Sequence, residues 1–345
     1  MPDPISGRRL MLPDPGSPVV VAPMAGGPST TGLVVAAAEA GAVGFLAAGY
    51  KSPEAVEEQV RTLRTRNVRY GLNIFVPMPP PADPAPLEEY RRELQDEADR
   101  YGVELPPLRL HDDDHFAAKV DIAVDAAVPL VSFAFGVPDR AVVRALQVAG
   151  SAVLITVTSA DEAARAAAVG PDAVIAQGGS AGAHSSTTAP ATYRGSTTAL
   201  EVLRAVRAAV DLPVIATGGV AGPDDVHALL AAGAVAVQAG TMFLLAGEAG
   251  TRDVHRAALT GGRFTETVVT RAFTGQPARG LRNRFTDVHT GSAPVGYPAI
   301  HHLTAPIRAA AAERGDPDGV HLWAGTGFAA ARPGSVREIV ERLSP

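Results

Sequence analysis

Cysteine is absent from this chain of 345 residues, and charged residues make up only 19% of it. Without cysteine the protein has no disulfide framework, no thiolate metal site and no cysteine nucleophile. The 30 basic residues are outnumbered by 36 acidic ones, the net charge is -6, and no block of basic residues occurs. This distribution argues against a nucleic-acid-binding surface.

Long hydrophobic segments are also scarce. Met1–Pro15 lacks the apolar core of a signal peptide, so we expect a soluble cytoplasmic protein. Ala228–Gly247 is uncharged and long enough to span a bilayer. It is interrupted by glycines and by Gln238, however, and much of its apolar content is alanine. We therefore expect a helix end, a buried parallel strand and a loop there, and no contact with a membrane.

The chain does contain a repeating series of short apolar runs, and 46% of its residues are hydrophobic. Runs of Val, Ile, Leu and Ala predict eight strands, at 18–22, 43–47, 70–75, 130–133, 152–156, 173–176, 214–217 and 235–238. Helical patterns lie between most of them, at 33–40, 53–65, 141–148, 160–169, 199–210 and 224–232. Eight strands alternating with helices predict an α/β fold, the closed TIM (β/α)8 barrel, over an open sheet.

The predicted barrel occupies residues 1–256 and is enlarged after its third strand. An insertion at about 77–110 starts as Pro-rich extended chain and continues as a charged helix over 87–101. At that point it lies at the C-terminal face of the barrel, where it can cover an active site. Residues 257–345 are irregular and end in a predicted helix over 335–343. We expect the insertion and this C-terminal segment to form a lid subdomain.

Two glycine turns, each directly after an apolar run, carry the strongest functional signal. Gly218 and Gly219 follow the seventh predicted strand, and Gly240 and Thr241 follow the eighth. In (β/α)8 barrels the loops after these two strands converge on a phosphate group. Glycine lets backbone N–H groups approach phosphate oxygens, and the next helix N-terminus adds its positive dipole end. Tight turns without a ligand are the alternative, but two in succession favour a phosphorylated cofactor.

The loop after the sixth predicted strand, Gln177–His184, is rich in small residues that let a planar ligand approach the backbone. His184 could supply a proton or a positive field, and the alternative is a flexible loop with an incidental histidine. Residues 178–182 also match the G-x-S-x-G nucleophile elbow. That motif needs a helix directly after the serine, and 185–190 is a poor helix start. A hydrolase is therefore the weaker interpretation.

Strand ends supply two further candidates. Met24 closes the Ala22-Pro23-Met24 segment after the first predicted strand, and Asn73 lies at the end of the third. Side chains at the C-terminal ends of barrel strands point into the barrel mouth, so both could contact a ligand. The alternatives are core filling for Met24 and a loop hydrogen bond for Asn73.

Three other clusters predict no site. The His-Asp-Asp-Asp-His run at 111–115 resembles a metal cluster, but its acidic residues fit a helix N-terminus and its histidines fit solvent, so we expect no metal. The glycine pattern at 325–330 matches a relaxed dinucleotide fingerprint with too little chain left for a βαβ unit. Arg279, Arg282 and Arg284 could bind an anion, and a solvated basic tail is the simpler interpretation.

Together these segments resemble the nitronate monooxygenases, formerly called 2-nitropropane dioxygenases, in their class I bacterial and fungal branch. The matching segments run nearly end to end, at 22–27, 47–51, 73–77, 177–184, 213–219, 238–243, 273–280, 282–285, 297–298 and 322–325. Other flavin barrels share the paired glycine turns, so the order of the segments carries the resemblance.

The resemblance implies a TIM barrel with non-covalent FMN that oxidises alkyl nitronates, and by extension nitroalkanes, with O2 to a carbonyl compound and nitrite. His184 would be the active-site histidine beside the flavin ring. By position, the FMN contacts would be Ala22, Pro23, Met24, Asn73, Gln177, Gly182, Gly218, Gly219, Gln238, Ala239, Gly240 and Thr241. In such a site the protein orients the substrate and tunes the flavin, which carries the electrons.

One segment departs from the family pattern. The family loop usually reads Glu-Ala-Gly-Gly-His-Arg-Gly, whereas residues 180–186 read Ser-Ala-Gly-Ala-His-Ser-Ser. The acidic and basic neighbours that would orient or charge His184 are gone, which bears on substrate and rate more than on FMN binding. An FMN-dependent NAD(P)H reductase of enoyl-thioester or quinone type, and a flavin-binding protein with little turnover, remain alternatives. The sequence also leaves a homodimer open.

Overall fold

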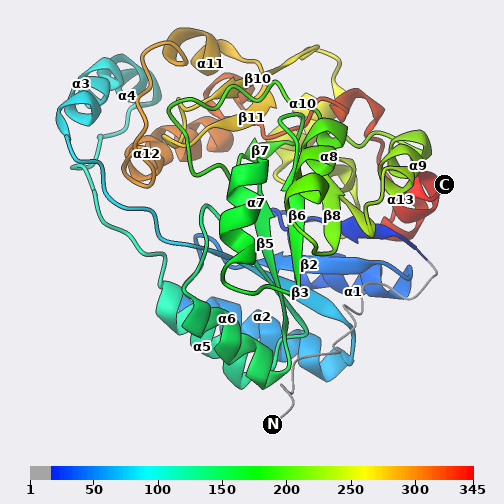
Figure 1. Ribbon diagram of the computed structural model, residues 1–345. Coiled ribbons are helices and arrows are strands. Elements are labelled where there is room, and N and C mark those ends of the chain that lie inside the picture. The colour runs from blue at the N-terminus through cyan, green and yellow to red at the C-terminus, as the bar shows by residue number, and fades with distance from the viewer. Residues whose placement is uncertain (1–16) are drawn as a thin grey trace.

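The computed structural model describes residues 17–345, and its centre is a closed barrel of parallel strands (Figure 1). The strands run around the barrel in the order β1 Val19–Val21, β2 Val43–Ala47, β3 Tyr70–Phe75, β4 Leu130–Ala134, β5 Ala152–Val157, β6 Ala173–Gln177, β8 Val214–Thr217 and β9 Ala236–Ala239. These bounds differ from the predicted ones by at most one residue at either end, and the TIM-barrel prediction is confirmed. The segment Met1–Pro15, whose composition argues against a signal peptide, lies outside the described residues.

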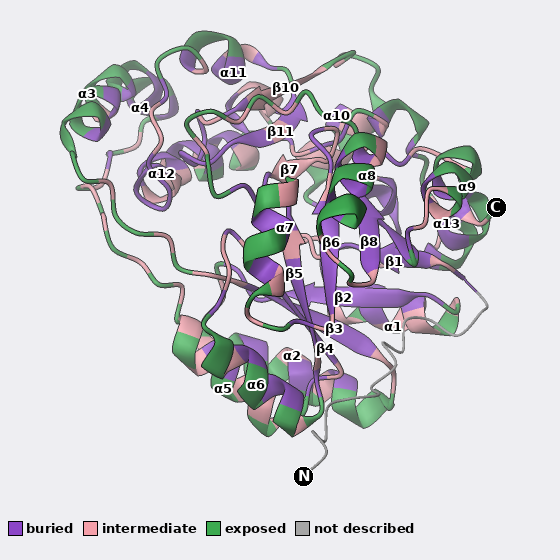
Figure 2. Ribbon diagram, viewed as in Figure 1, coloured by how far each residue is buried: buried purple, intermediate pink, exposed green. Residues whose placement is uncertain are grey.

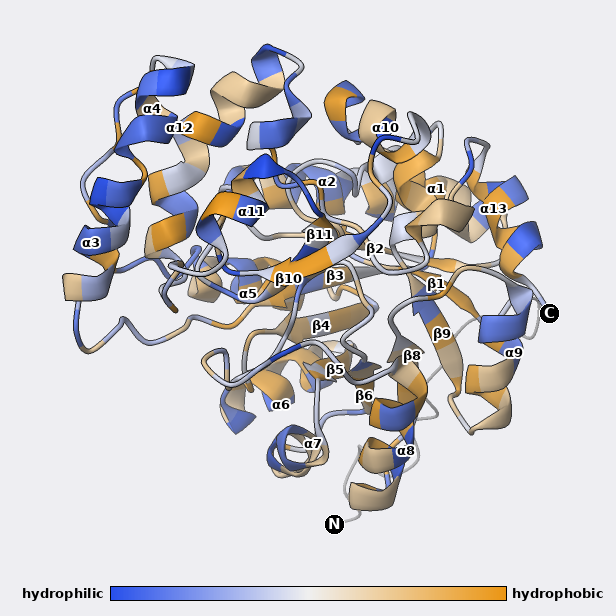
Figure 3. Cartoon of the chain, turned by 90° about the horizontal axis from the view of Figure 1, so that it is seen from above, coloured by the Kyte–Doolittle hydropathy of each residue, from blue (hydrophilic) through white to orange (hydrophobic). Residues whose placement is uncertain are grey.

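The strands form a barrel because their side chains are apolar on both faces. Val20, Phe45, Leu130, Leu154 and Ile215 belong to one buried cluster inside the barrel. The residues that face outward pack against the helices, and Figure 2 shows buried strands within a shell of partly exposed helices. Figure 3, which looks down on the molecule from above, shows the apolar strands surrounded by helices with hydrophilic outer faces.

Helices follow the strands and cover the outside of the barrel. They are α1 Thr31–Glu39, α2 Pro53–Arg66, α5 Phe116–Asp125, α6 Arg140–Ala149, α7 Ala160–Ala167, α8 Ala199–Ala209 and α9 Pro223–Ala231. Ser52, Ser159 and Thr198 cap three of them by accepting a backbone N–H of the first turn. The sequence predicted only the start of α5, which lies between β3 and β4 in the chain and packs against β3.

The insertion after β3 holds two helices, α3 Ala85–Glu93 and α4 Gln95–Tyr101, where the sequence predicted a single one. They lie beside α11 Arg284–His289 and α12 Ala299–Glu313, away from the barrel helices (Figure 1). Leu87 of α3, Phe285 and Ile300 belong to one buried cluster. Glu97 also accepts hydrogen bonds from both Nη atoms of Arg284, at 2.5 and 2.6 Å. The insertion and the C-terminal segment therefore pack against each other.

The C-terminal segment also supplies a small sheet above the barrel. Strands β10 Thr267–Thr270 and β11 Ala278–Leu281 pair antiparallel, and β11 pairs with β7 Ala183–His184, which follows barrel strand β6. The remaining elements are α10 Asp253–Thr260, α13 Val336–Leu343 and the 3-10 helices η1 Thr241–Leu245, η2 Pro317–Gly319 and η3 Phe328–Ala330. Helix α13, predicted over 335–343, returns to pack against α1 and α9.

The uncharged stretch Ala228–Gly247 divides among the end of α9, strand β9 and helix η1, as predicted. Within residues 17–345, no helix is long and apolar enough to cross a membrane.

Candidate active site

A cavity of about 490 Å³ opens at the carboxyl ends of the barrel strands. All the predicted site residues line it: Ala22, Pro23, Met24, Asn73, Gln177, Gly182, His184, Gly218, Gly219, Gln238, Ala239, Gly240 and Thr241. They come from the ends of β1, β3, β6, β8 and β9 and from the loop that leads to β7. The structure therefore brings together residues that are more than 200 positions apart in the sequence.

Under the loops after β8 and β9, the cavity wall is made of backbone. Gly218 and Gly219 have φ angles of 122° and 74°, a region that favours glycine. A Cβ on Gly219 would lie 2.8 Å from Ser180 Oγ, so no side chain fits there. Gly240 precedes η1, whose first N–H groups point out of its N-terminus. Such a surface of backbone donors suits a phosphate group.

A third glycine turn, from the end of the chain, completes this wall. Gly325 N–H donates to Thr241 Oγ1 at 3.0 Å, and Thr326 N–H donates to the Ser180 carbonyl at 3.0 Å. Gly325 and Gly327 both line the cavity. The glycine pattern at 325–330 forms a turn and η3, not a βαβ unit, as expected. Its place in the cavity was missed, because only folding brings residue 325 next to residue 241.

Two amide side chains at strand ends have unused acceptors. Asn73 Oδ1 on β3 and Gln238 Oε1 on β9 are buried without a hydrogen-bond partner within the described part of the chain. Both residues line the cavity. A buried acceptor left unpaired costs roughly 1–3 kcal/mol, so a ligand that donates hydrogen bonds to these oxygens would remove a penalty. Of the two alternatives weighed for Asn73, a ligand contact fits this geometry better than a loop hydrogen bond.

Gln177, by contrast, is fully engaged with the loop that follows it. Its Oε1 accepts the Ser186 N–H at 2.7 Å, and its Nε2 donates to the His184 carbonyl at 3.0 Å. Ser186 Oγ in turn donates to the Thr156 carbonyl and accepts the N–H of Phe135. Ser186, which stands where the family loop has glycine, therefore holds the loop by neutral hydrogen bonds.

His184 lies in β7, so the histidine is held in a sheet and is not part of a flexible loop. The same strand follows Ser180 where a nucleophile elbow needs a helix, which excludes the hydrolase interpretation. The ring centroids of Phe135, Trp323 and Tyr297 lie 5.4, 5.5 and 6.0 Å from that of His184. Burial, and secondarily the charge of Arg308, lowers the pKa of His184 to about 3, so the ring is neutral at pH 7.

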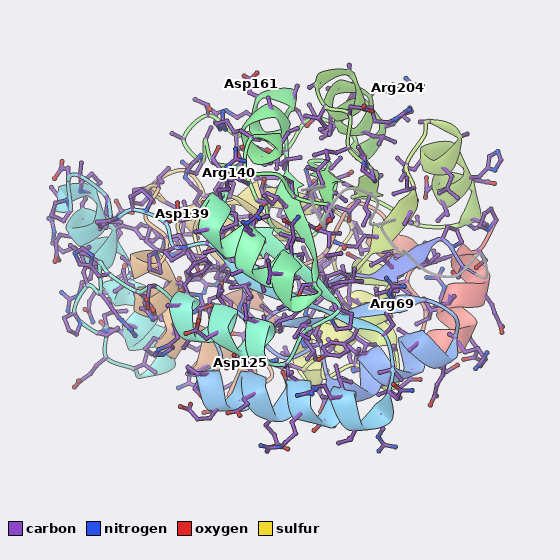
Figure 4. All side chains as sticks on the ribbon, turned by 60° about the horizontal axis from the view of Figure 1, so that its bottom comes forward. Arg69, Asp125, Asp139, Arg140, Asp161 and Arg204 are labelled. Atoms are coloured by element: carbon purple, nitrogen blue, oxygen red, sulfur yellow. The ribbon has the colours of Figure 1, made fainter. Side chains whose placement is uncertain are left out.

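Two arginines, Arg252 and Arg308, line the cavity, and no Asp or Glu occurs among the described residues of its wall. His255, His301 and His321 line it as well, but burial lowers the pKa of each below the usual histidine value, so the positive charge comes from the arginines. The charged residues of the barrel helices lie elsewhere: Figure 4 shows Asp161 of α7 and Arg204 of α8 at the outer surface, and both are exposed. The positive charge of the cavity wall is therefore not balanced by an acidic residue among the described lining residues.

Arg308 of α12 carries the buried part of this charge. Its Nη2 donates to the His301 carbonyl at 2.7 Å and its Nε donates to Thr304 Oγ1 at 3.0 Å, while Nη1 lies 3.4 Å from His321 Nδ1. No carboxylate forms an ion pair with it in the described structure. Burial lowers the pKa of Arg308 to about 10, which leaves it charged at pH 7. No sequence pattern pointed to Arg308, because the His301-His302 pair on the same helix is uninformative alone.

Tyr50 is a further lining residue that was not predicted as a site residue. It has a φ of 67°, which is unusual for a bulky side chain, and its ring stacks on His301 with centroids 4.1 Å apart. Its N–H donates to Asp114 Oδ1 at 3.0 Å, and the same oxygen pairs with buried Lys119 at 2.8 Å. A buried ion pair thus holds the loop after β2 in a conformation that places an aromatic ring at the cavity.

The acidic run at 111–115 lies directly before α5, as expected, and its histidines are exposed. None of its carboxylates caps the helix, however, because the N-cap residue is His115 and it makes no side-chain capping hydrogen bond. No cluster of residues suited to a metal ion occurs within residues 17–345. Asp114 pairs with Lys119, and Asp112 accepts a 2.7 Å hydrogen bond from His302 Nε2, a contact that the sequence did not predict.

The three arginines near residue 280 do not line the cavity. Arg279 donates to the carbonyls of Gly179 and Gly195 at 2.8 and 2.9 Å. Arg282 pairs with acidic residues of its own segment, and Arg284 with Glu97. Arg279 and Arg284 tie loops together, so the solvated-tail interpretation is wrong for these two, whereas Arg282 is exposed as that interpretation expects.

Fold and cavity define a class: a (β/α)8-barrel enzyme with its cavity at the carboxyl ends of the strands. The model of the nitronate monooxygenase family matches residues 14–345. The chain belongs to the nitronate monooxygenase family, and it is an oxidoreductase.

Relatives and solved structures agree with this assignment. Probable nitronate monooxygenases of Staphylococcus aureus strains MRSA252 and MSSA476 are 32% identical over 314 residues, covering 89% of this chain and 88% of theirs. The crystal structure of nitroalkane oxidase from Streptomyces ansochromogenes is 44% identical, with a TM-score of 0.90 over 95% of this chain and 94% of that one. FabK from Thermotoga maritima is more distant, 25% identical with a TM-score of 0.73 over 95% and 91%.

Proposed function

We propose that the cavity holds FMN non-covalently and that the protein oxidises alkyl nitronates with O2 to a carbonyl compound and nitrite. Family membership supports a flavin. The backbone wall at Gly218, Gly219 and Gly240 fits one phosphate group, and the unpaired oxygens of Asn73 and Gln238 fit the N–H donors of a flavin ring. FMN is preferred to FAD because the chain carries no adenine–ribose fingerprint beyond this phosphate site.

The observation that carries the choice of substrate is the charge of the cavity wall. Arg308 is buried and charged, it has no carboxylate partner in the described structure, and no acidic residue lines the cavity. A buried charge of this kind is stabilised by an anionic ligand. An alkyl nitronate is such a ligand, because it is the anion that a nitroalkane forms when it loses its α-proton. The wall therefore favours a nitronate over a neutral substrate.

His184 favours the same form of the substrate. Bound flavin would supply the electron-transfer chemistry, for which the protein itself has no group. His184 is neutral at pH 7, and its low pKa makes it a weak acceptor for the α-proton of a nitroalkane. A nitronate has already lost that proton. We therefore expect nitronates to react faster than the parent nitroalkanes, with His184 required mainly for the latter.

Two measurements on purified protein test this function. Heat or acid should release a chromophore that chromatography identifies as FMN. The holoenzyme should consume O2 and form nitrite with ethyl or propyl nitronate. Release of FAD, or colourless protein that FMN does not reconstitute, would contradict the cofactor. Oxidation of NAD(P)H without any turnover of nitronates would identify a reductase, and FMN binding with neither activity would identify a flavin-binding protein.

A further inference from the structure

The two ring nitrogens of His184 have different surroundings. Nε2 lies 3.0 Å from Thr274 Oγ1. Nδ1 has no hydrogen-bond partner in the described structure, and the ring lines the cavity. Thr274 is buried and lies in the turn that connects β10 and β11. Nε2 is thus bonded to the protein, and Nδ1 is available to a ligand.

The position of the ring is fixed from both sides of its strand. Gln276 Nε2 donates to the carbonyls of Ser185 and Thr187 at 2.9 and 3.1 Å. Gln177 Nε2 donates to the carbonyl of His184 itself at 3.0 Å. Because these hydrogen bonds hold the backbone around His184, the fold itself places Nε2 next to Thr274.

The contacts of the Thr274 hydroxyl determine which atom is the donor. Oγ1 lies 3.2 Å from the Gln276 carbonyl oxygen and 3.4 Å from the Gln276 backbone nitrogen. A hydroxyl donates one proton and accepts with two lone pairs. The carbonyl oxygen can only accept, and the backbone N–H can only donate. One lone pair of Thr274 is left for the histidine, so a fully satisfied network requires the proton of His184 on Nε2.

We propose that Thr274 is a positioning residue, whose hydroxyl holds His184 as the neutral Nε2–H tautomer and leaves the Nδ1 lone pair free in the cavity. A carboxylate in this place would stabilise the charged ring, whereas a hydroxyl that already donates to a carbonyl does not. Thr274 therefore sets the tautomer of the ring, while burial and the charge of Arg308 keep the ring neutral. The sequence alone showed the histidine but not this partner.

For the reaction, this inference rests on the proposed function and refines it at one step. With a nitroalkane, the C–H bond next to the nitro group breaks, its proton moves to Nδ1, and its electron pair stays on the substrate as the nitronate. Nε2 keeps its proton throughout. A preformed nitronate needs no such transfer. Loss of the Thr274 hydroxyl should therefore slow nitroalkane oxidation much more than nitronate oxidation.

The tautomer can be observed directly by ¹⁵N NMR of protein labelled at histidine nitrogens, with His184→Asn used to assign the signals. In wild type, the His184 signals should show a protonated Nε2 and an unprotonated Nδ1. Thr274→Ser keeps the hydroxyl and should keep this pattern. Thr274→Val removes it and should shift the signals toward the other tautomer. Thr270→Val is the matched control, because it removes a buried hydroxyl outside the cavity wall that bonds Thr290 and not His184.

The kinetic arm compares each variant on nitroethane and on ethyl nitronate at matched FMN content. We expect Thr274→Val to lower the nitroalkane-to-nitronate rate ratio by about ten- to a hundredfold, and Thr274→Ser to restore most of it. An Nδ1–H tautomer in wild type, or unchanged signals in Thr274→Val, would overturn the inference. So would an equal loss of rate on both substrates. The NMR arm needs no turnover, so its result stands even if the protein oxidises no nitronate.

Discussion

The two ends of the cavity are built in different ways. The end under β8 and β9 is a wall of backbone, made by glycines that each follow a strand directly. The opposite end is a wall of side chains, chiefly Arg308 and His301 of α12 and His321 beyond it. A glycine turn is determined by residues that are adjacent in the sequence. The side-chain wall forms only when α12 packs over the barrel. The backbone end suits a cofactor that related enzymes share. Substitutions at the side-chain end can change which substrate binds without affecting the cofactor.

The largest effect is expected at the backbone end. Gly240→Glu should abolish FMN retention, because its carboxylate would lie at the phosphate wall and repel the phosphate. Gly240→Ala is the control for folding: its Cβ would make only an ordinary 3.4 Å contact with Ala22 Cβ. FMN content per protein and the thermal unfolding midpoint are the measurements. A Gly240→Glu variant that purifies with full FMN would move the phosphate elsewhere.

His184→Asn should affect chemistry and leave the cofactor in place. We expect a loss of roughly a hundredfold in nitroalkane turnover, the usual contribution of an acid–base group, and a smaller loss with nitronates. FMN content should stay near that of wild type, because the glycine turns are untouched. Stopped-flow measurement of flavin reduction without oxygen compares the two proteins. Equal rates with a nitroalkane would remove His184 from the mechanism.

Arg308→Met tests the side-chain end alone. Loss of the buried charge should raise the KM for a nitronate by about tenfold or more, the usual scale for a hydrogen bond to a charged group, and should raise the KM for a neutral nitroalkane less. Arg308→Lys keeps a positive charge and should lie between Arg308→Met and wild type. Steady-state kinetics with both substrates measure the difference. A KM for nitronate that is the same in Arg308→Met and wild type would show that the cavity charge does not select the substrate.

The smallest effect concerns the ion pair between Glu97 of the insertion and Arg284 of α11. Burial raises the pKa of Glu97, but the two hydrogen bonds from Arg284, together with nearby His289, outweigh burial and lower the pKa to about 2. A lowered folded-state pKa means that the pair stabilises the fold above the usual Glu pKa of about 4.3, and that this stability is lost as the pH falls toward 2. Glu97→Gln should therefore lower the free energy of unfolding by about 2 kcal/mol at pH 7 and by less at pH 3.

Urea unfolding of Glu97→Gln at the two pH values provides this measurement. The exposed Glu89→Gln on neighbouring α3 is the control, and it should change stability little at either pH. An effect of Glu97→Gln that is as large at pH 3 as at pH 7 would show that the ion pair does not contribute as proposed.

The sequence predicted what is encoded locally. Each barrel strand is a short apolar run with its own boundaries, and Gly218, Gly219 and Gly240 mark their turns by the absence of a side chain. Strand β7 has only two residues and exists because it pairs with β11, about a hundred positions later, so no pattern in its own sequence predicted it. In the sequence, Arg308 is likewise only a polar residue in an amphipathic helix. The packing of α12 places it at the cavity.

The same limit explains why the chemistry of His184 was only half predicted. Its motif identified the residue, while Thr274, which engages its Nε2, lies 90 positions away. Arg279 and Arg284 were misjudged for the same reason, because their partners come from distant loops and from the insertion. Distance along the chain, more than residue type, separates what could be predicted from what could not.

We propose that the two ends of one cavity together serve nitronate oxidation by a bound flavin. The most direct test mixes the FMN-loaded protein anaerobically with propyl nitronate, and separately with NADH or NADPH, and follows the absorbance of the oxidised flavin. We expect rapid bleaching by the nitronate, recovery of colour when O2 is admitted, nitrite in the product, and no comparable bleaching by either nicotinamide. Rapid bleaching by NADH or NADPH with no response to the nitronate would contradict the account.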